Sequence, residues 1–168
     1  GGGEPRGVCG SGLVDVVAVG LKLGRILPSG RLANGSAEWP LTDLVKLTQR
    51  DIRELQLAKA AIAAGTKLLL KRAGVSSDQV ARTYLAGAFG NYVKPSSARA
   101  VGLLLFPPER VVHAGNTALT GAKVALFYTP DQRDFWHLRK KLEHVSLAGD
   151  PDFEDTFVAE MTFPSRSS

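Results

Sequence analysis

The sequence predicts an α/β fold, in which strands and helices alternate along the chain. Two observations carry this prediction. Short apolar strands at 80–86 and 111–114 each run into a glycine-rich turn and then a helix, and a long amphipathic helix at 48–73 precedes them. Strands that alternate with helices in this way argue for α/β layers. The 168 residues are enough for one such domain with its own core.

The first element is expected to be a helix. A small-residue turn at 10–12 leads into an apolar run at 13–19 without a breaker. Periodicity does not separate strand from helix in such a run, and we predict a helix because the turn suits a helix N-terminus. Residues 28–43 are rich in Pro, Gly and Ser, and they predict a loop or a hairpin with its tip at Asn34-Gly35.

The clearest element is a helix over 48–73. Thr48 and Asp51 have the spacing of a capping box, although Asp replaces the usual Glu or Gln. Gly74 follows as a left-handed C-terminal cap. At about 100° per residue, one wide apolar face is made by Ile52, Leu55, Ala58, Ile62, Thr66 and Leu69.

Lys59 is the exception on this helix, because it projects within the apolar sector between Ile52 and Leu55. One interpretation is a lysine at the edge of the stripe whose ammonium group reaches water. The other is a cation that points into a ligand cleft. The sequence leaves both open.

The second half of the chain holds the two strand–turn–helix units and a charged region. We expect its last residues, 164–168, to be a flexible tail. The predicted order after the long helix is a strand at 80–86, a glycine-rich turn at 87–91, a helix at 95–104, a strand at 111–114, a turn at 115–117, a helix at 118–127, an amphipathic helix at 131–143, a strand at 144–147 and an apolar segment at 153–163.

Composition and charge exclude several classes of protein. Apolar residues make up 44% and charged residues 22%, a globular balance that argues against disorder. No apolar run approaches the roughly 20 residues of a membrane span, and no signal peptide is visible. The formal charge of +5 is scattered, so nucleic acid is not an expected partner. The single cysteine, Cys9, excludes an internal disulfide and is consistent with a reducing cytoplasm.

Among the features of the sequence, the glycine-rich turns are the strongest candidates for a ligand-binding site. Glycine lets backbone amides approach an anion, and the turns at 10–12, 87–90 and 115–117 have this character. Each turn alone is explained by the conformational needs of a turn, but two of them occupy corresponding places after strands. The P-loop motif and the dinucleotide fingerprint GxGxxG are both absent from the sequence.

Other candidate sites are weak. His113, His137 and His144 lack the spacing of metal ligands, so we expect no metal site. The acidic residues within 150–155 are interpreted as a solvated run, and we identify no catalytic residue. Cys9 is either a buried, inert thiol or, beside glycines at a helix start, one with a lowered pKa.

Four blocks of the sequence share their order and spacing with one known family. They are GVCGSGLVD at 7–15, TQRDIRELQLAKAAI at 48–62, YLAGAFGNY at 84–92 and GNTALTGA at 115–122. Together they resemble the C-terminal part of the reductive activators of corrinoid-dependent proteins. The resemblance covers about residues 4–163, nearly the whole chain.

The resemblance implies both a fold and an activity. Such activators carry an N-terminal [2Fe–2S] ferredoxin-like domain, a linker region and a C-terminal ATPase domain of the acetate and sugar kinase/Hsp70/actin type. They return an inactive Co(II) corrinoid to Co(I), with an electron from the cluster and with ATP as the driving force. Residues 1–163 are then the second, ribonuclease-H-like lobe of the ATPase domain. The chain is expected to be a fragment, since its only methionine is Met161.

The resemblance also implies a nucleotide site for ATP with Mg²⁺. The phosphate loop, the acidic residues for Mg²⁺ and the cluster cysteines are implied to lie upstream of Gly1. In this chain the turn after the first strand maps to the segment that holds adenosine, the preceding helix offers polar side chains, and the second turn closes the cleft or serves the hinge. The implied residues are Lys59 and Gln56 on the helix, Gly87, Ala88, Phe89, Gly90 and Asn91 after the first strand, and Gly115, Asn116 and Thr117 after the second.

Two other functions stay open. One is a docking module that keeps the fold, has lost nucleotide binding and presents a surface to a corrinoid protein. The other resembles the activators of 2-hydroxyacyl-CoA dehydratases, in which Cys9 would bridge a [4Fe–4S] cluster between two subunits. The expected partners are a corrinoid protein (a corrinoid iron–sulfur protein or a methyltransferase corrinoid subunit), the rest of the ATPase domain and, in a homodimer, a second copy of the chain.

Overall fold

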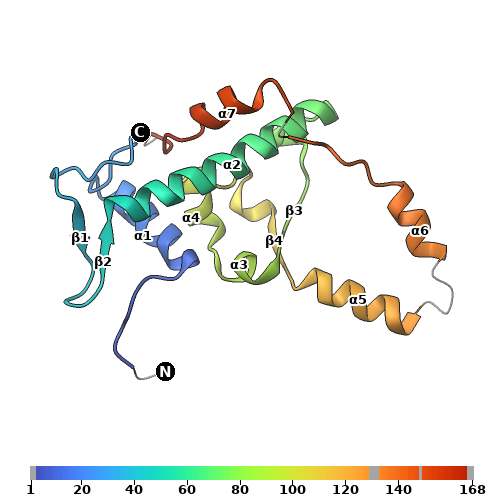
Figure 1. Ribbon diagram of the computed structural model, residues 1–168, viewed down its shortest axis with the longest axis horizontal. Helices are drawn as coiled ribbons and strands as arrows, with labels where there is room; N and C mark the ends of the chain where they lie inside the picture. The colour runs from blue at the N-terminus through green and yellow to red at the C-terminus, as the bar shows by residue number, and fades with distance from the viewer. Residues whose placement is uncertain (1–2, 129–132, 148, 166–168) are drawn as a thin grey trace.

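A computed structural model describes residues 3–128, 133–147 and 149–165. It is a mixed α/β domain built around the long helix α2 (Gln49–Ala73), which crosses the middle of the molecule (Figure 1). Helix α1 (Gly10–Lys22) packs on α2, and α7 (Phe153–Ala159) lies along it. Helices α1 and α7 are therefore both arranged around α2 in the body of the domain.

Helix α2 begins and ends where the sequence predicts. The Thr48 hydroxyl accepts the N–H of Asp51, and the Asp51 carboxylate accepts the N–H of Thr48, so both halves of the capping box form. Gly74 ends the helix with a left-handed φ of 65°. The buried face differs from the prediction, because Ile62 and Leu69 are exposed. The apolar residues that α2 buries are Ile52, Leu55, Ala60, Ala63, Ala64 and Leu68.

Helix α1 confirms the choice of helix over strand. Its Val14 and Val17 are fully buried, so the valines that favour a strand are used here as core residues of a helix. Gly20 allows the next segment to approach, because a Cβ atom there would lie 2.5 Å from the Ile26 side chain. Tertiary packing has thus overridden local propensity.

The N-terminal hairpin corrects the predicted position of the turn. Strands β1 (Glu38–Pro40) and β2 (Lys46–Thr48) pair antiparallel, so the tip lies at 41–45 and not at Asn34-Gly35. The Thr42 hydroxyl accepts the N–H groups of Leu44 and Val45 and stabilises this tip. Asn34-Gly35 forms a separate turn after an isolated bridge between Ile26 and Leu32.

The two predicted strands form a parallel pair, β3 (Thr83–Ala86) and β4 (Val111–Gly115). β3 begins three residues later than predicted, because residues 80–82 have no strand partner among the described residues. The predicted turn at 87–91 is instead helical, α3 (Gly87–Tyr92). The next helix, α4 (Pro95–Ala100), ends before the predicted residue 104, since Gly102 adopts a left-handed φ of 75°.

The C-terminal third projects from the body and then returns to it (Figure 1). Helices α5 (Thr117–Tyr128) and α6 (Arg133–Lys140) confirm the two predicted helices, although part of the second prediction, 131–132, lies outside the described residues. The strand predicted at 144–147 is wrong, because that segment has no neighbouring strand among the described residues. Two short 3-10 turns, η1 (Ser77–Gln79) and η2 (Pro108–Arg110), complete the elements.

The core lies where α1, α2, α4 and the end of the chain meet. Phe163, the residue before the predicted tail at 164–168, is buried there, and residues 166–168 lie outside the described part. No described helix has both the length and the apolar character needed to cross a membrane. The main members of the core are Val14, Val17, Leu21, Ile26, Leu47, Ile52, Leu55, Val93, Val101, Leu103 and Phe163.

Candidate functional site

The parallel pairing of β3 and β4 brings two of the predicted turns together. Ala86 at the end of β3 pairs with Gly115 at the end of β4. Gly87 and Gly115 therefore lie side by side at the carboxyl ends of the two strands. In α/β proteins this edge of a parallel sheet is where ligands bind. We call the segments 87–91 and 115–117 the glycine edge.

The two glycines of the edge have open space in front of them. Gly87 has a φ of 84° and Gly115 a φ of 69°, and a Cβ atom built on either would meet no heavy atom within 4 Å. Gly90 differs, because a Cβ there would lie 3.1 Å from the carbonyl carbon of Leu85. Gly90 is thus required for packing α3 onto β3, whereas Gly87 and Gly115 leave room for a ligand.

Side chains around the glycine edge are mostly exposed, including those of Ala88, Phe89, Asn91 and Thr117. Two contacts hold the edge in shape. The His113 ring nitrogen Nδ1 lies 2.6 Å from the Gly90 carbonyl oxygen, and it is the donor because a carbonyl only accepts. The Asn116 side chain accepts the N–H of Leu119, which caps the start of α5.

Residues 10–12, predicted as a third turn, are instead the start of helix α1, and they also reach the edge. A Cβ on Gly10 would lie 3.5 Å from the Phe89 ring. The neighbouring Cys9 is exposed and not buried, which decides between the two interpretations of this thiol. A hydrogen bond with the Ser11 hydroxyl and one with the N–H of Gly12 lower the pKa of Cys9.

Gln56 and Lys59 are separate from the glycine edge. Both are buried, and both donate hydrogen bonds to backbone carbonyl groups. Gln56 is 3% exposed, and its amide nitrogen donates to the carbonyl oxygens of Ser29 and Met161. Lys59 is 1% exposed, and its ammonium group donates to the Thr162 carbonyl at 2.8 Å. The interpretation of Lys59 as a lysine that reaches water is therefore wrong. Burial lowers its pKa, which the carboxylate of Glu160 at 4.0 Å partly offsets.

Two glycines make room for these buried side chains. A Cβ on Gly30 would lie 2.4 Å from the Gln56 amide, and one on Gly102 would lie 3.1 Å from the Lys59 nitrogen. The described contacts of Gln56 and Lys59 thus join α2 to the segment 160–163, and none of their hydrogen bonds or ion pairs reaches the glycine edge. The structure does not bring the two groups of predicted site residues together.

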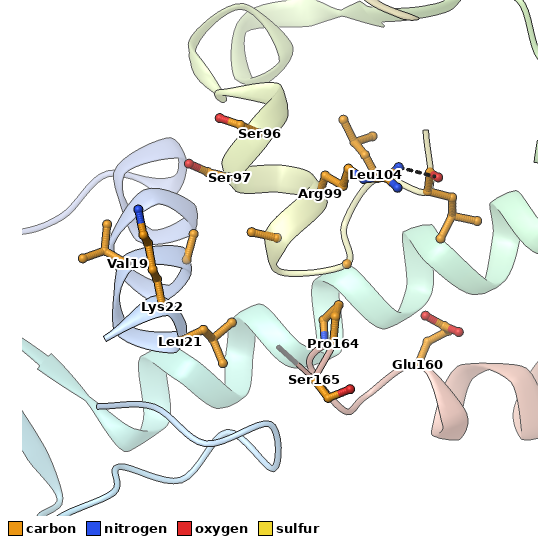
Figure 2. Close-up of a pocket in the computed structure, with 14 residues that line it drawn as sticks. Val19, Leu21, Lys22, Ser96, Ser97, Arg99, Leu104, Glu160, Pro164 and Ser165 are labelled. Atoms are coloured by element: carbon orange, nitrogen blue, oxygen red, sulfur yellow. Dashed lines mark hydrogen bonds between the residues drawn. The ribbon is translucent and has the colours of Figure 1, made fainter. Parts of the chain in front are cut away.

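An open groove lies between α1, α4 and the end of the chain, as Figure 2 shows. Its volume is about 850 Å³. Sequence reasoning missed it, because its lining comes from three segments far apart in the chain and no motif marks them. The polar residues that line it are Lys22, Ser96, Ser97, Arg99, Glu160 and Ser165.

Of the acidic residues at 150–155 that were interpreted as a solvated run, Asp150 and Asp152 are ion-paired, whereas Glu154 and Asp155 are exposed. Asp150 accepts from Arg72 at 3.1 Å, and Asp152 pairs with Lys71, so this segment is held against α2. The N–H of Asp152 and the guanidinium of Arg72 lower the pKa of Asp150. Within the described residues no group of three or more His, Cys, Asp or Glu side chains is arranged to hold a metal ion.

Comparison with known proteins gives a consistent result. A family described as the C-terminal domain of RACo, the ASKHA domain, matches residues 1–168. "Corrinoid activation enzyme RamQ" of Eubacterium limosum is 31% identical over 95% of this chain and 31% of its own length. The "[Co(II) methylated amine-specific corrinoid protein] reductase" of Methanosarcina barkeri is 27% identical over 95% of this chain and 30% of its own length.

A solved structure shares the fold. The chain superposes on a "Reductive activator for corrinoid,iron-sulfur protein" with a TM-score of 0.80 and 28% sequence identity. The match covers 94% of this chain and 28% of that protein. The chain therefore spans less than a third of the length of the proteins that it matches.

Proposed function

The chain belongs to the family of RACo C-terminal ASKHA domains, and from that premise we propose that it is the ATP-binding lobe of a reductive activator. The whole activator would return the Co(II) form of a corrinoid protein to Co(I), using ATP and an electron from an iron–sulfur domain outside this chain. The names of the two relatives, both of which refer to corrinoid proteins, support this assignment. Within such a protein this chain is the second, ribonuclease-H-like lobe.

The glycine edge carries the proposal. Two positive-φ glycines lie side by side at the carboxyl ends of parallel strands, with open space in front of them. Backbone without side chains can approach a nucleotide more closely than any other backbone can, and strand ends of this kind bind nucleotides in α/β folds. In the proposed site Gly87 and Gly115 supply the close approach, and Phe89 offers an exposed ring to the base.

The remaining residues have different roles in the proposal. Gly90 and His113 hold the edge in shape, whereas Asn91 and Thr117 are free to contact the ribose or the phosphates. Gln56 and Lys59 are expected to reach a nucleotide only if the segment 160–163 leaves α2, because that segment holds both side chains in the conformation described here.

Some of the machinery must come from elsewhere in the protein. A [2Fe–2S] cluster needs four ligands, usually cysteines, and this chain has one cysteine. The described residues hold no acidic cluster for Mg²⁺. The lobe therefore binds and orients the nucleotide, and the groups that hold Mg²⁺ and activate water are expected in the other lobe. We expect the isolated chain not to hydrolyse ATP at a useful rate.

Calorimetry with ATP on the full-length protein tests the proposal. Gly115→Val should weaken ATP binding at least tenfold, and Gly87→Val should act in the same way. Gly35→Val is the matched control, because Gly35 has the same φ of 69° and the same open surroundings but lies in the N-terminal loop. ATP binding that Gly115→Val leaves unchanged, or that Gly35→Val weakens equally, would overturn the assignment.

One observation favours the docking module as a second candidate. Many apolar side chains of α5 and α6 are exposed, and exposed apolar patches are typical of surfaces that bind another protein. Binding of a corrinoid protein that neither ATP nor Gly115→Val affects would support that function. The third function, an activator of the 2-hydroxyacyl-CoA dehydratase type, is not supported, because the chain belongs to the family of RACo C-terminal ASKHA domains.

A further inference from the structure

Helix α3 ends with a backbone carbonyl group that the helix itself does not satisfy. Each carbonyl of an α-helix accepts the N–H four positions further on, and the last carbonyls of the helix lose that partner. Helix α3 has six residues and ends at Tyr92, so the carbonyl of Gly90 would need the N–H of Lys94. Lys94 has an extended backbone instead, and among the described residues no backbone N–H donates to the Gly90 oxygen.

His113 of β4 supplies the missing donor. Its ring nitrogen Nδ1 lies 2.6 Å from the Gly90 oxygen. A histidine near the C-terminus of a helix often bonds to the last carbonyls of that helix. Here the histidine lies 23 positions further along the chain and belongs to a different element. The bond therefore caps α3 and, at the same time, fastens its end to β4.

A bulge in β4 brings His113 close to the second turn of the glycine edge. Leu85 pairs with His113 and the next residue, Ala86, pairs with Gly115, so Ala114 is the extra residue of the bulge. A bulge bends the strand and changes the direction of the side chains near it. The residue that caps α3 and the glycine of the second turn thus pair with consecutive residues of β3.

The other contacts at the two ends of α3 come from α1. The Phe89 ring lies against Gly10, and the Lys94 ammonium group lies 3.1 Å from the Asp15 carboxylate. The Lys94 side chain is 69% exposed, so water weakens this ion pair. Within the part of the chain that the structure describes, the bond from His113 is the side-chain hydrogen bond that connects the first segment of the glycine edge with β4.

We propose that His113 is a positioning residue of the nucleotide site, because its Nδ1–H group sets the spacing between Gly87 on α3 and Gly115 after β4. This role rests on the proposed function, since the ligand of the glycine edge is taken to be a nucleotide. A ligand that contacts both turns binds more tightly when their spacing is fixed before it arrives. Without His113, the ligand would first have to order the end of α3.

The bond also determines where the imidazole ring carries its proton. A carbonyl oxygen only accepts, so Nδ1 must be the protonated nitrogen. In the neutral ring Nε2 is then left without a proton. The role of His113 therefore has a spectroscopic signature that is independent of any ligand.

ATP titrations of the full-length protein test the role in binding. His113→Ala should weaken ATP binding about five- to tenfold, the equivalent of one lost hydrogen bond. His113→Asn should restore most of the affinity, because the asparagine amide nitrogen can take the place of Nδ1. His113→Gln should not restore it, because the glutamine amide nitrogen takes the place of Nε2.

Lys94→Met is the matched control. It removes an exposed contact at the same end of α3 and leaves the bond to β4 intact, so ATP affinity should change by no more than about twofold. Equal losses in Lys94→Met and His113→Ala would overturn the role of His113, because any contact at this helix end would then suffice.

Nitrogen NMR of the full-length protein, labelled with ¹⁵N in its histidines, tests the geometry without ATP. At mildly alkaline pH, where histidine rings are neutral, the signals that disappear in His113→Asn should be those of a protonated Nδ1 and an unprotonated Nε2. A proton on Nε2 instead would overturn the proposal, whether or not ATP binds.

The two measurements separate this proposal from the proposed function. If the wild type binds ATP but His113→Ala binds it equally well, or if asparagine restores no more affinity than glutamine, the positioning role is wrong and the nucleotide site stands. If the wild type does not bind ATP, the proposed function fails and the nucleotide role of His113 fails with it. A protonated Nδ1 would in that case still support the cap on α3.

Discussion

The body around α2 and the projecting helix α5 both carry large apolar side chains, but these side chains lie in opposite environments. In the body, Ile52, Val14 and Phe163 are removed from water, and even the polar side chains of α2 find carbonyl partners. In α5, Leu126 and Phe127 face solvent. The helices of both regions are regular. What separates them is the presence or absence of a second layer against which a helix can bury its apolar side chains.

A regular helix in this domain therefore does not imply that its apolar side chains are buried. In the described part of the body, the buried side chains of Gln56 and Lys59 both find hydrogen-bond partners. Helix α5 leaves most of its large apolar side chains exposed in the described part of the chain. The two regions should therefore respond differently to the same substitution.

The largest expected effect contrasts Ile52→Ala with Leu126→Ala in the 168-residue chain. Ile52→Ala should lower the free energy of unfolding by about 2–5 kcal/mol, because it leaves a cavity in the core. Leu126→Ala should change it by no more than about 0.5 kcal/mol, because that side chain is in water. Urea denaturation measures both. A cost of Leu126→Ala equal to that of Ile52→Ala would refute the distinction.

The next effect tests whether Lys59 is a structural cation of the body. Lys59→Met should cost about 1–3 kcal/mol at neutral pH, because the charged hydrogen bond to the Thr162 carbonyl is lost. Burial lowers the folded-state pKa of Lys59 below its ordinary 10.5, so the unfolded state binds the proton more tightly. The wild type should therefore gain stability relative to Lys59→Met as the pH rises through the folded pKa towards 10.5.

Denaturation curves of the two proteins across this alkaline range provide the measurement. Lys67→Met is the control for a lysine that also pairs with Glu160 but is half-exposed. A difference between wild type and Lys59→Met that stays constant or shrinks as the pH rises would show that Lys59 is solvated, and would weaken the case for a closed body.

A smaller effect is expected at the start of α2. Thr48→Ala should cost about 1 kcal/mol, because the N–H of Asp51 loses its acceptor and the capping box is broken. Thr48→Ser should retain nearly all of the stability, since its hydroxyl can accept the same bond. Thermal unfolding compares the two. Equal losses for alanine and serine would mean that the methyl group, and not the cap, is what matters at this position.

The smallest effect is expected where α7 returns to α2. Asp152→Asn removes the ion pair with Lys71, whose exposed position allows salt to screen it. The loss of stability should be smaller than that of Thr48→Ala at low salt and should disappear at high salt. Melting temperatures at the two ionic strengths measure it. A loss that persists in high salt would contradict the assignment of this contribution to a screened surface ion pair.

The sequence predicted best the elements whose signals are local. The capping box at Thr48, the glycine cap at Gly74 and the order of β3 and β4 were correct because each depends on neighbouring residues. The hairpin tip was misplaced because the Asn34-Gly35 signal competes with a turn that the Thr42 hydroxyl stabilises. The strand predicted at 144–147 failed because a strand exists only where a second strand pairs with it.

The candidate site also combines features that the sequence predicts with features that only the tertiary structure decides. The sequence alone determined that glycine turns follow both strands, and parallel pairing then made Gly87 and Gly115 neighbours. Only the tertiary structure decided that Lys59 and Gln56 face carbonyl groups of residues more than a hundred positions away along the chain. The physical reason is that helix periodicity specifies which face a side chain shares, whereas its partner depends on which distant segment packs there.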